Sequence, residues 1–287
     1  MSTPTWSVRV PASSANLGSG FDVLGMALSV HAEVGVGPAP GDAQRADEFH
    51  PATIAFRRLG GEGDLWVRSS IPMGRGMGFS GAVRVGGAAA AVVQSDGRDA
   101  LDGARRDDVM RVAAELEGHA DNAAASLYGG VVITVDDRVT RVPLAFDPAV
   151  VMWIPDSETT STDHSRTTLE GSVSRADAVY NLGRVAMFVA ACASGDVAAL
   201  RTATEDRLHQ PARLAAVPET AAALQAALDV DVWAGWLSGS GPSVAMLCES
   251  ARADEVAASL PATGHTKVLH IDHEGATLVE FATTFDD

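Results

Sequence analysis

Alternation of apolar and polar residues predicts two strands near the start of the chain. The first begins at Trp6, and the second covers residues 28–36. A period of two is typical of a strand that buries one face. Between them, residues 11–22 form a loop of small residues with Asn16 and Asp22 as polar anchors. Loops on a rigid scaffold often carry function, although Asn and Asp in turns also bind their own backbone.

Helical periodicity and short apolar runs predict the remaining elements. The helical pattern of residues 106–127 is interrupted at Gly118, where we expect a break. Helices that alternate with short strands indicate an α+β fold. We expect strands at residues 65–67, 131–135, 139–146, 150–154, 244–248, 267–271 and 276–281, and helices at 54–59, 82–94, 106–127, 175–193, 197–209, 220–228 and 251–260.

The densest group of glycines lies at residues 71–82, IPMGRGMGFSGA, directly before the predicted helix 82–94. Glycines let backbone amides turn inward and approach a ligand. A helix N-terminus adds unpaired N–H groups and the positive end of the helix dipole. Together these features predict a cradle for an anion, most often phosphate. The alternative is an ordinary glycine turn before a buried helix.

Three known motifs can be compared with this glycine loop. A Walker A loop requires a lysine after its glycines, and it is excluded because Lys267 is the only lysine. Residues 76–81 fit G-x-G-x-x-G, but residues 69–72 separate them from the apolar strand that a dinucleotide fold requires. A serine-hydrolase nucleophile at Ser80 lacks the buried strand that should precede it.

Composition and charge limit the class of protein. The chain has 287 residues, 46% of them apolar, and a net charge of −16, which predicts one or two domains and no nucleic-acid partner. An acidic chain with a single lysine resembles proteins of halophilic organisms, although a GC-rich genome is an alternative origin. Cys192 and Cys248 lie in apolar surroundings, which indicates a reducing compartment. The absence of a signal peptide and of an 18-residue apolar run predicts a soluble cytoplasmic protein with no membrane partner.

Polar residues gather in two further segments. Residues 115–122 contain Glu115, Glu117, His119, Asp121 and Asn122. This density suggests a site, although a solvated helix corner would have the same composition. A polar loop at residues 155–168 carries Thr162 and Arg166 and would pass, taken alone, as a flexible linker.

Five segments in this order resemble the GHMP kinase superfamily and, within it, the family of homoserine kinases. They are residues 11–22, 72–82, 117–124, 208–213 and 237–242. The resemblance implies a two-domain fold with a ribosomal-protein-S5-like N-terminal domain and a ferredoxin-like C-terminal domain. We place their boundary at Asp147 and Pro148, giving domains 1–148 and 149–287. It also implies a homodimer that uses ATP and Mg²⁺ to phosphorylate L-homoserine for threonine biosynthesis.

The resemblance also implies roles for individual residues. Those that would bind the nucleotide are Pro72, Met73, Gly74, Arg75, Gly76, Met77, Gly78, Phe79, Ser80, Gly81, Ala82, Gly239 and Gly241. Those that would bind L-homoserine are Asn16, Asp22, His119, Asp121, Thr162, Arg166 and Arg213, with the two arginines on its carboxylate. Ser80 and Glu117 would hold Mg²⁺, and the catalytic residues would be Asp121, Asn122 and Ser80.

Two departures from the family pattern affect these roles. Phe79 stands where the family loop carries a serine. Only Gly118 separates Glu117 from His119, without the usual insertion, so Glu115 is an alternative metal ligand. Asp121 is either the base for the substrate hydroxyl, or the phosphate accepts the proton while Asn122 orients the hydroxyl.

Other functions compatible with the same residues are a GHMP kinase for mevalonate, shikimate or pantoate, and a catalytically silent GHMP-fold sensor. A zwitterionic substrate is favoured over these alcohols by Asp22 and the two arginines, and intact Ser80, Glu117 and Asp121 argue against the sensor.

Overall fold

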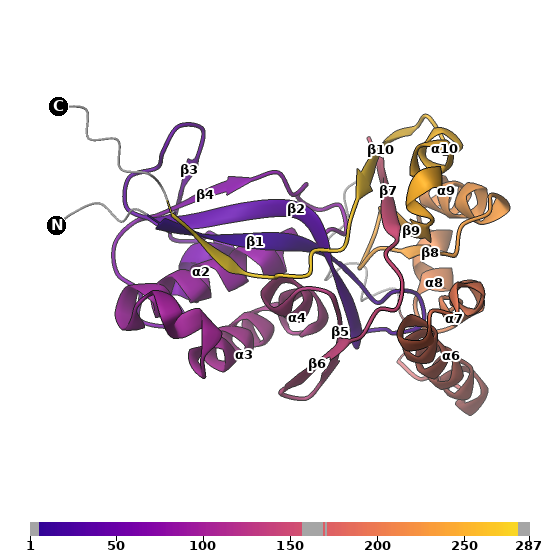
Figure 1. The fold of residues 1–287 in the computed structure, drawn as a ribbon, viewed down its shortest axis with the longest axis horizontal. Helices are drawn as coiled ribbons and strands as arrows, with labels where there is room; N and C mark the ends of the chain where they lie inside the picture. The colour runs from indigo at the N-terminus through magenta and orange to yellow at the C-terminus, as the bar shows by residue number, and fades with distance from the viewer. Residues whose placement is uncertain (1–5, 157–168, 170, 281–287) are drawn as a thin grey trace.

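The computed structural model describes residues 6–156, 169 and 171–280. The first of its two sheets has seven strands in the order β11-β1-β2-β4-β3, with β5 joined to β2 and β6 to β5 (Figure 1). Its strands are β1 (Trp6–Ala15), β2 (Leu24–Val36), β3 (Gln44–Ala46), β4 (Leu65–Ser69), β5 (Val131–Val135), β6 (Arg138–Val142) and β11 (Thr277–Glu280).

One face of this sheet is covered by helices grouped around α2 (Figure 1). The predicted helix at 82–94 is confirmed and extends over Phe79–Asp96. Its alanines pack tightly, and at Gly87 a Cβ atom would lie 2.0 Å from the carbonyl oxygen of Ala52. The small side chains therefore let α1 approach α2. The helices of this unit are α1 (Pro51–Arg58), α2, α3 (Arg105–Glu117) and α4 (Asp121–Tyr128), with a 3₁₀ turn at Arg98–Asp102.

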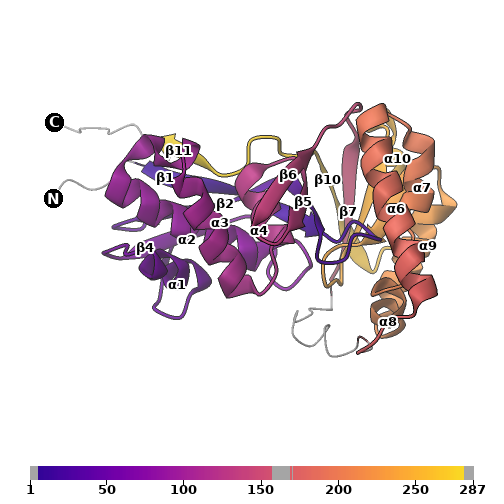
Figure 2. The same cartoon turned by 90° about the horizontal axis from the view of Figure 1, so that it is seen from below.

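The second sheet is antiparallel, in the order β10-β7-β9-β8. Its helices lie on the side that faces away from the first unit (Figures 1 and 2). Trp153 is fully buried in the core between this sheet and its helices. The elements are β7 (Ala149–Pro155), β8 (Ala234–Leu237), β9 (Val244–Cys248), β10 (Gly264–Leu269), α6 (Arg175–Ser194), α7 (Leu200–Ala203), α8 (Gln210–Ala215), α9 (Pro218–Asp229) and α10 (Ala253–Ala258), with 3₁₀ turns at Val197–Ala199 and Ser250–Arg252.

The last described strand, β11, returns to the first sheet and pairs antiparallel with β1, with Trp6 opposite Glu280. The division at residue 148 stays a prediction. The range 149–287 includes a strand whose hydrogen bonds belong to the other unit. The sequence predicted a strand at 276–281, and only long-range pairing assigns it to a sheet.

The single helix predicted at 197–209 is wrong. A 3₁₀ turn and the short helix α7 end at Ala203, and a separate helix, α8, begins at Gln210. The Asp206 carboxylate accepts hydrogen bonds from the backbone N–H groups of Leu208, His209 and Gln210 at 2.7–3.0 Å. These bonds replace the helical pattern, because an Asp side chain competes for local backbone donors.

The break at Gly118 is confirmed: α3 ends there with the glycine in the left-handed conformation. Both cysteines are buried and unbonded, and burial raises the pKa of the Cys192 thiol to about 12. Among the helices of the described residues, none is long and apolar enough to serve as a membrane span.

Candidate active site

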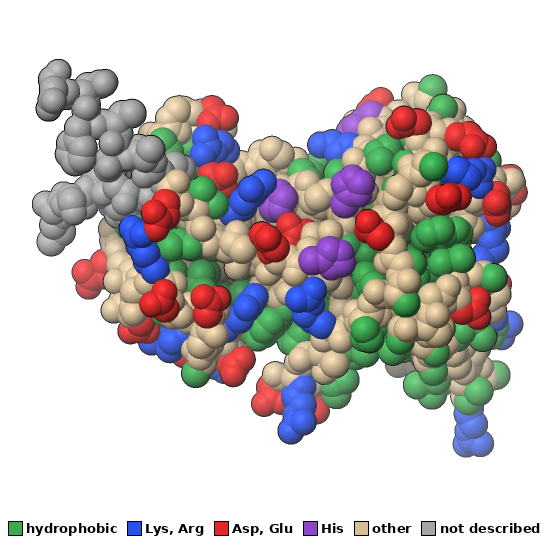
Figure 3. All heavy atoms as spheres, viewed as in Figure 1, with side chains coloured by type: hydrophobic (Ala, Val, Ile, Leu, Met, Phe, Trp, Pro, Cys, Tyr) green, Lys and Arg blue, Asp and Glu red, His purple; other side chains and the backbone are tan. Residues whose placement is uncertain are grey.

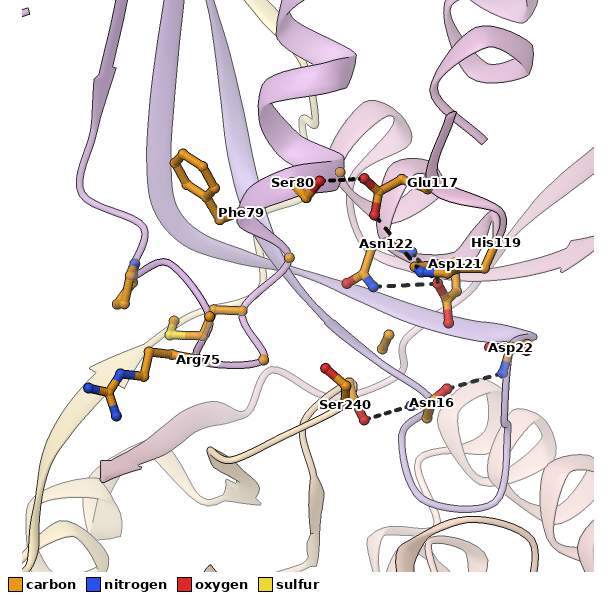
Figure 4. Close-up of a pocket in the computed structure, with 18 of the residues that line it drawn as sticks. Asn16, Asp22, Arg75, Phe79, Ser80, Glu117, His119, Asp121, Asn122 and Ser240 are labelled. Atoms are coloured by element: carbon orange, nitrogen blue, oxygen red, sulfur yellow. Dashed lines mark hydrogen bonds and ion pairs between the residues drawn. The ribbon is translucent and has the colours of Figure 1, made fainter. Parts of the chain in front are cut away.

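A pocket between the two units collects the predicted site residues (Figure 4). Its cavity volume is about 180 Å³. The walls come from the β1–β2 loop, the glycine loop, the junction of α3 and α4, α8 and the turn after β8. Its lining residues are Ala15, Asn16, Asp22, Pro72, Gly74, Arg75, Gly76, Met77, Gly78, Phe79, Ser80, Gly81, Glu117, His119, Asp121, Asn122, Arg213, Gly239 and Ser240.

The glycine loop leads into α2 through Gly78, which has a φ of 66°. A Cβ atom there would lie 2.0 Å from Ser13 Oγ, so both the backbone conformation and the close approach require glycine. Among the described residues, no side chain caps the N-terminus of α2, and its first residues line the pocket. The N–H groups and dipole of this end are therefore available to an anion.

Three contacts fix the position of the glycine loop. Ser238 Oγ donates to the Gly76 carbonyl at 2.6 Å, and the Ser13 N–H donates to the Met77 carbonyl at 3.2 Å. Arg75 donates to the Pro155 carbonyl at 2.5 Å, and its side chain points away from Ser80 in Figure 4. The loop is thus held by both units, which pre-organises it for a ligand.

Ser80 and Glu117 lie together at the N-terminus of α2. Ser80 Oγ donates to Glu117 Oε1 at 2.6 Å, and the carboxylate is 8% exposed. A hydroxyl and a carboxylate are the oxygen donors that Mg²⁺ prefers, and Mg²⁺ usually takes one or two protein ligands together with substrate phosphates. The donor set therefore fits this ion. The alternative ligand, Glu115, does not line this pocket and pairs with Arg58 on the surface at 2.8 Å.

The end of α3 and the start of α4 place His119 between two carboxylates. Its Nδ1 lies 3.1 Å from Asp121 Oδ1, and its Nε2 lies 3.9 Å from Glu117 Oε2. Asp121 is 2% exposed, and its Oδ1 also accepts the Asn122 N–H at 2.7 Å. Asn122 Oδ1 in turn accepts from Ser13 Oγ at 2.8 Å. This network fixes the orientation of each side chain before a substrate enters.

The opposite wall is built by the β1–β2 loop and the turn after β8. Asn16 joins the two, since its Nδ2 donates to the Gly239 carbonyl at 2.9 Å and its Oδ1 accepts the Asp22 N–H at 3.0 Å. Arg213 is 5% exposed and donates to the same Gly239 carbonyl at 3.2 Å. A buried guanidinium in a small-molecule pocket is suited to a carboxylate or phosphate.

His209 supports this wall from below the surface. It is fully buried, and its Nε2 lies 2.8 Å from the Gly18 carbonyl. Burial lowers the pKa of His209 below its ordinary value, although the nearby Asp206 carboxylate opposes this shift. The neutral imidazole, with its proton on Nε2, therefore donates to the Gly18 carbonyl and leaves Nδ1 as an acceptor for Arg213 NH1 at 3.2 Å.

Some predicted site residues lie elsewhere. Met73 is 67% exposed and Ala82 is fully buried, and neither they nor Gly241 belong to the pocket lining. Phe79 reaches the lining, but its ring packs edge-on against His50 at 6.4 Å and points away from Ser80 and Glu117 (Figure 4). Thr162 and Arg166 lie outside the described residues.

Four further residues of this site were not predicted from the sequence. Ala15 and Ser240 line the pocket, Ser13 anchors Asn122, and Arg84 contacts Ser80 and Glu117. Only Arg84 leaves a signal in the sequence, as a charged residue within an apolar helix four positions after Ser80.

Comparisons with known proteins identify what this chain resembles. The profile of the family "GHMP kinases N terminal domain" matches residues 49–130, and that of "GHMP kinases C terminal" matches residues 188–266. The chain is 41% identical to a homoserine kinase of Thermus thermophilus, over 91% of this chain and 94% of that one. It is 35% identical to a homoserine kinase of Streptomyces coelicolor, over 97% of this chain and 96% of that one.

Solved structures share the fold. A homoserine kinase from Cytophaga hutchinsonii superposes with a TM-score of 0.82 at 24% identity, covering 97% of this chain and 99% of that one. A mevalonate kinase from Methanococcus jannaschii superposes with a TM-score of 0.66 at 11% identity, covering 92% of this chain and 98% of that one. At these identities the likeness concerns the fold, and it matches the two units described above.

Proposed function

This chain belongs to the homoserine kinases of the GHMP kinase family, and we propose that it transfers the γ-phosphoryl group of ATP to L-homoserine. The product is O-phospho-L-homoserine, a precursor of threonine. Beyond the family membership, one observation supports the proposal. The uncapped N-terminus of α2, with Ser80 and Glu117 beside it, shares a single pocket with the buried Arg213. A phosphate-binding end and a carboxylate-binding end thus belong to one site.

At the phosphate end, the protein contributes position and charge. The N–H groups of the glycine loop and of α2 would hold the ATP phosphates. Ser80 and Glu117 would hold Mg²⁺, which would supply positive charge to offset the charge of the transferring phosphoryl group. Phosphoryl transfer requires little covalent chemistry from the protein, so this arrangement accounts for most of the catalysis.

At the amino-acid end, charge selects the substrate. The Arg213 guanidinium would bind the carboxylate of L-homoserine through a planar fork, and the Asp22 carboxylate would bind its ammonium group. Asn16 and His119 would border the space between them. Arg166 and Thr162 stay predictions as further contacts to the substrate. A zwitterion satisfies both charges, whereas mevalonate, shikimate and pantoate lack the ammonium group.

The substrate hydroxyl must lose a proton as the new O–P bond forms. The Asp121 carboxylate would accept it as the base, and His119 and the Asn122 N–H orient its Oδ1. The transferring phosphate is the alternative acceptor, with Asn122 orienting the hydroxyl. Replacement of Asp121 distinguishes the two, as described below.

An ADP-release assay tests the proposed function. Mg-ATP is supplied with homoserine, shikimate, mevalonate or pantoate in molar KCl. We expect turnover with homoserine only. Turnover with one of the other alcohols would overturn the substrate assignment. ATP binding without any turnover would favour the silent sensor.

A homodimer is part of the proposal. Helix α6 runs along the outside of the second unit (Figure 2) and exposes Val179, Leu182 and Met187 by 61%, 69% and 41%. An exposed apolar stripe of this kind is typical of an interface. We expect sedimentation equilibrium to give a dimer for the wild type and a monomer for Leu182→Glu, and a monomeric wild type would reject this interface.

Location and salt response follow from composition. We propose a cytoplasmic enzyme adapted to high salt, because a net charge of −16 is screened in concentrated salt. Enzyme activity that falls steadily with added KCl would contradict this adaptation. A halophilic archaeal source stays a prediction from composition. Lysine and arginine are interspersed with acidic side chains on the face in Figure 3, so this face offers nucleic acid no continuous basic patch.

A further inference from the structure

A charged side chain lies within the apolar helix α2 and has no role in the proposed function so far. Arg84 and the terminal Asp96 are the charged residues of this helix. The Arg84 side chain is only 19% exposed. Burying a charge is costly unless it is paired, so the position of Arg84 requires an explanation.

Its partners are the two proposed metal ligands. Arg84 NH1 donates to Ser80 Oγ at 2.6 Å and forms an ion pair with Glu117 Oε1. Arg84 follows Ser80 by four positions, so both lie on one face of α2, and a helical side chain leans toward the N-terminus of its helix. The guanidinium therefore lies over the first turn, where Glu117 arrives from the end of α3.

The same oxygen of Glu117 serves both neighbours. Oε1 accepts from Ser80 Oγ and from Arg84 NH1, whereas Oε2 lies 3.9 Å from His119 Nε2. Burial lowers the pKa of Arg84 below its ordinary value, but an arginine stays protonated in proteins. The Glu117 carboxylate is thus paired with the Arg84 guanidinium, and the pair carries no net charge.

We propose that Arg84 is a positioning residue that neutralises and orients Glu117, so that the free enzyme binds a divalent cation weakly and takes it up with the phosphates of ATP. The inference rests on the proposed kinase function. Mg²⁺ sites of this kind draw much of their affinity from substrate phosphates. The described residues also contain no group of three or more His, Cys, Asp or Glu side chains that could hold a metal ion.

The arrangement has a consequence for the order of binding. Without a nucleotide, a cation that approaches Ser80 and Glu117 also meets the Arg84 charge and the positive end of α2, both of which repel it. Phosphates would offset both positive charges. Removal of the Arg84 charge should therefore strengthen metal binding to the free protein, an effect opposite to that expected from damage to the site.

The test measures binding of Mn²⁺ alone to the nucleotide-free protein by electron paramagnetic resonance. An adjacent opposite charge changes the proton affinity of a carboxylate by about one to three pKa units. We expect Arg84→Met to bind Mn²⁺ at least about tenfold more tightly than the wild type by the same reasoning. Arg84→Lys, which keeps the charge, should stay near the wild type. Arg84→Met combined with Glu117→Gln should lose the gain.

Arg58→Met is the matched control. Arg58 pairs with Glu115, which lies on α3 like Glu117 but outside the pocket. The substitution should leave Mn²⁺ affinity unchanged. Arg84→Gln keeps a polar side chain and replaces Arg84→Met if circular dichroism shows that the latter is unfolded. Unchanged or weaker Mn²⁺ binding in folded Arg84→Met or Arg84→Gln, the variants that remove the charge, would overturn the inference. Homoserine turnover by the wild type tests the proposed function separately, so the two failures can be distinguished.

Discussion

Ser80 at the start of α2 lies beside Glu117 at the end of α3, and Ser80 Oγ donates a hydrogen bond of 2.6 Å to the Glu117 carboxylate, 37 positions away in the chain. The glycine loop delivers Ser80 to the first turn of α2, and Gly118 ends α3 one residue after Glu117. The start of one helix and the end of another thus bring the two proposed metal ligands together.

Glu117→Gln should therefore lower kcat by about 10²-fold or more, the loss typical of removing one group that stabilises transition-state charge. The amide keeps the shape of the side chain but binds Mg²⁺ poorly. Steady-state kinetics at several Mg²⁺ concentrations would measure the effect. The control is Glu115→Gln, two residues away and outside the pocket, which should retain nearly wild-type kcat. Equal losses in both variants would contradict the metal assignment.

Replacement of Arg213 should affect one substrate more than the other. Arg213→Lys keeps a positive charge but loses the planar fork, and a hydrogen bond to a charged group contributes about 1.5–3 kcal/mol. We expect the KM for homoserine to rise about tenfold or more by that measure, with a smaller change in the KM for ATP. Arg207→Lys, at a half-exposed arginine near the same motif, serves as the control. A rise of equal size in both KM values would argue against a carboxylate contact.

Asp121→Asn tests how the hydroxyl proton leaves. The substitution keeps the size of the side chain and removes its basicity, and general base catalysis is typically worth about 10²–10⁴-fold. We expect kcat to fall within that range while both KM values change little. A kcat close to that of the wild type would exclude Asp121 as the base and leave the phosphate as the proton acceptor. Measurement at saturating substrate separates this effect from binding.

Gly78→Ala should both destabilise the fold and weaken nucleotide binding. A left-handed conformation costs a non-glycine residue about 1–2 kcal/mol, and the new Cβ atom would also clash with Ser13 Oγ at 2.0 Å. Gly60 has a similar φ of 81° but no atom within 4 Å of an added Cβ, so Gly60→Ala isolates the conformational cost. Thermal unfolding and ATP titration should show a larger loss in Gly78→Ala, and equal losses would show that the clash is relieved.

The stability of the fold should fall in mild acid because of His209. Its pKa lies below the ordinary value of 6.5 in the folded protein, so below about pH 6.5 the unfolded chain binds a proton that the folded chain resists. Stability is therefore greatest above this pH and decreases as the pH falls toward the folded pKa.

Thermal unfolding at pH 7.5 and 5.5 in constant salt should show this loss of stability. In His209→Gln the difference between the two pH values should be smaller, and Tm should be lower at both pH values. His265→Gln, at an exposed site, should leave the pH dependence unchanged. An unaltered pH dependence in His209→Gln would assign the acid sensitivity to other groups.

Local sequence was sufficient to predict most elements and the glycine loop, because periodicity and glycine content act over neighbouring residues. It also placed Glu117, His119 and Asp121 in one candidate segment, and the structure brings these side chains to the same pocket as Asn16 and Arg213. The prediction at 197–209 was wrong because the Asp206 carboxylate, rather than helical hydrogen bonds, holds the backbone of the residues that follow it.

The order of the residues thus determines the chemistry that is available: an anion-binding helix start, carboxylates and arginines, and an acidic surface with one lysine. The tertiary fold decides which of these groups act together. It returns β11 to the first sheet, selects Glu117 over Glu115 beside Ser80, and places Arg84 on that pair. These choices depend on contacts between segments far apart in the chain, and no local pattern of side chains encodes the distances between them.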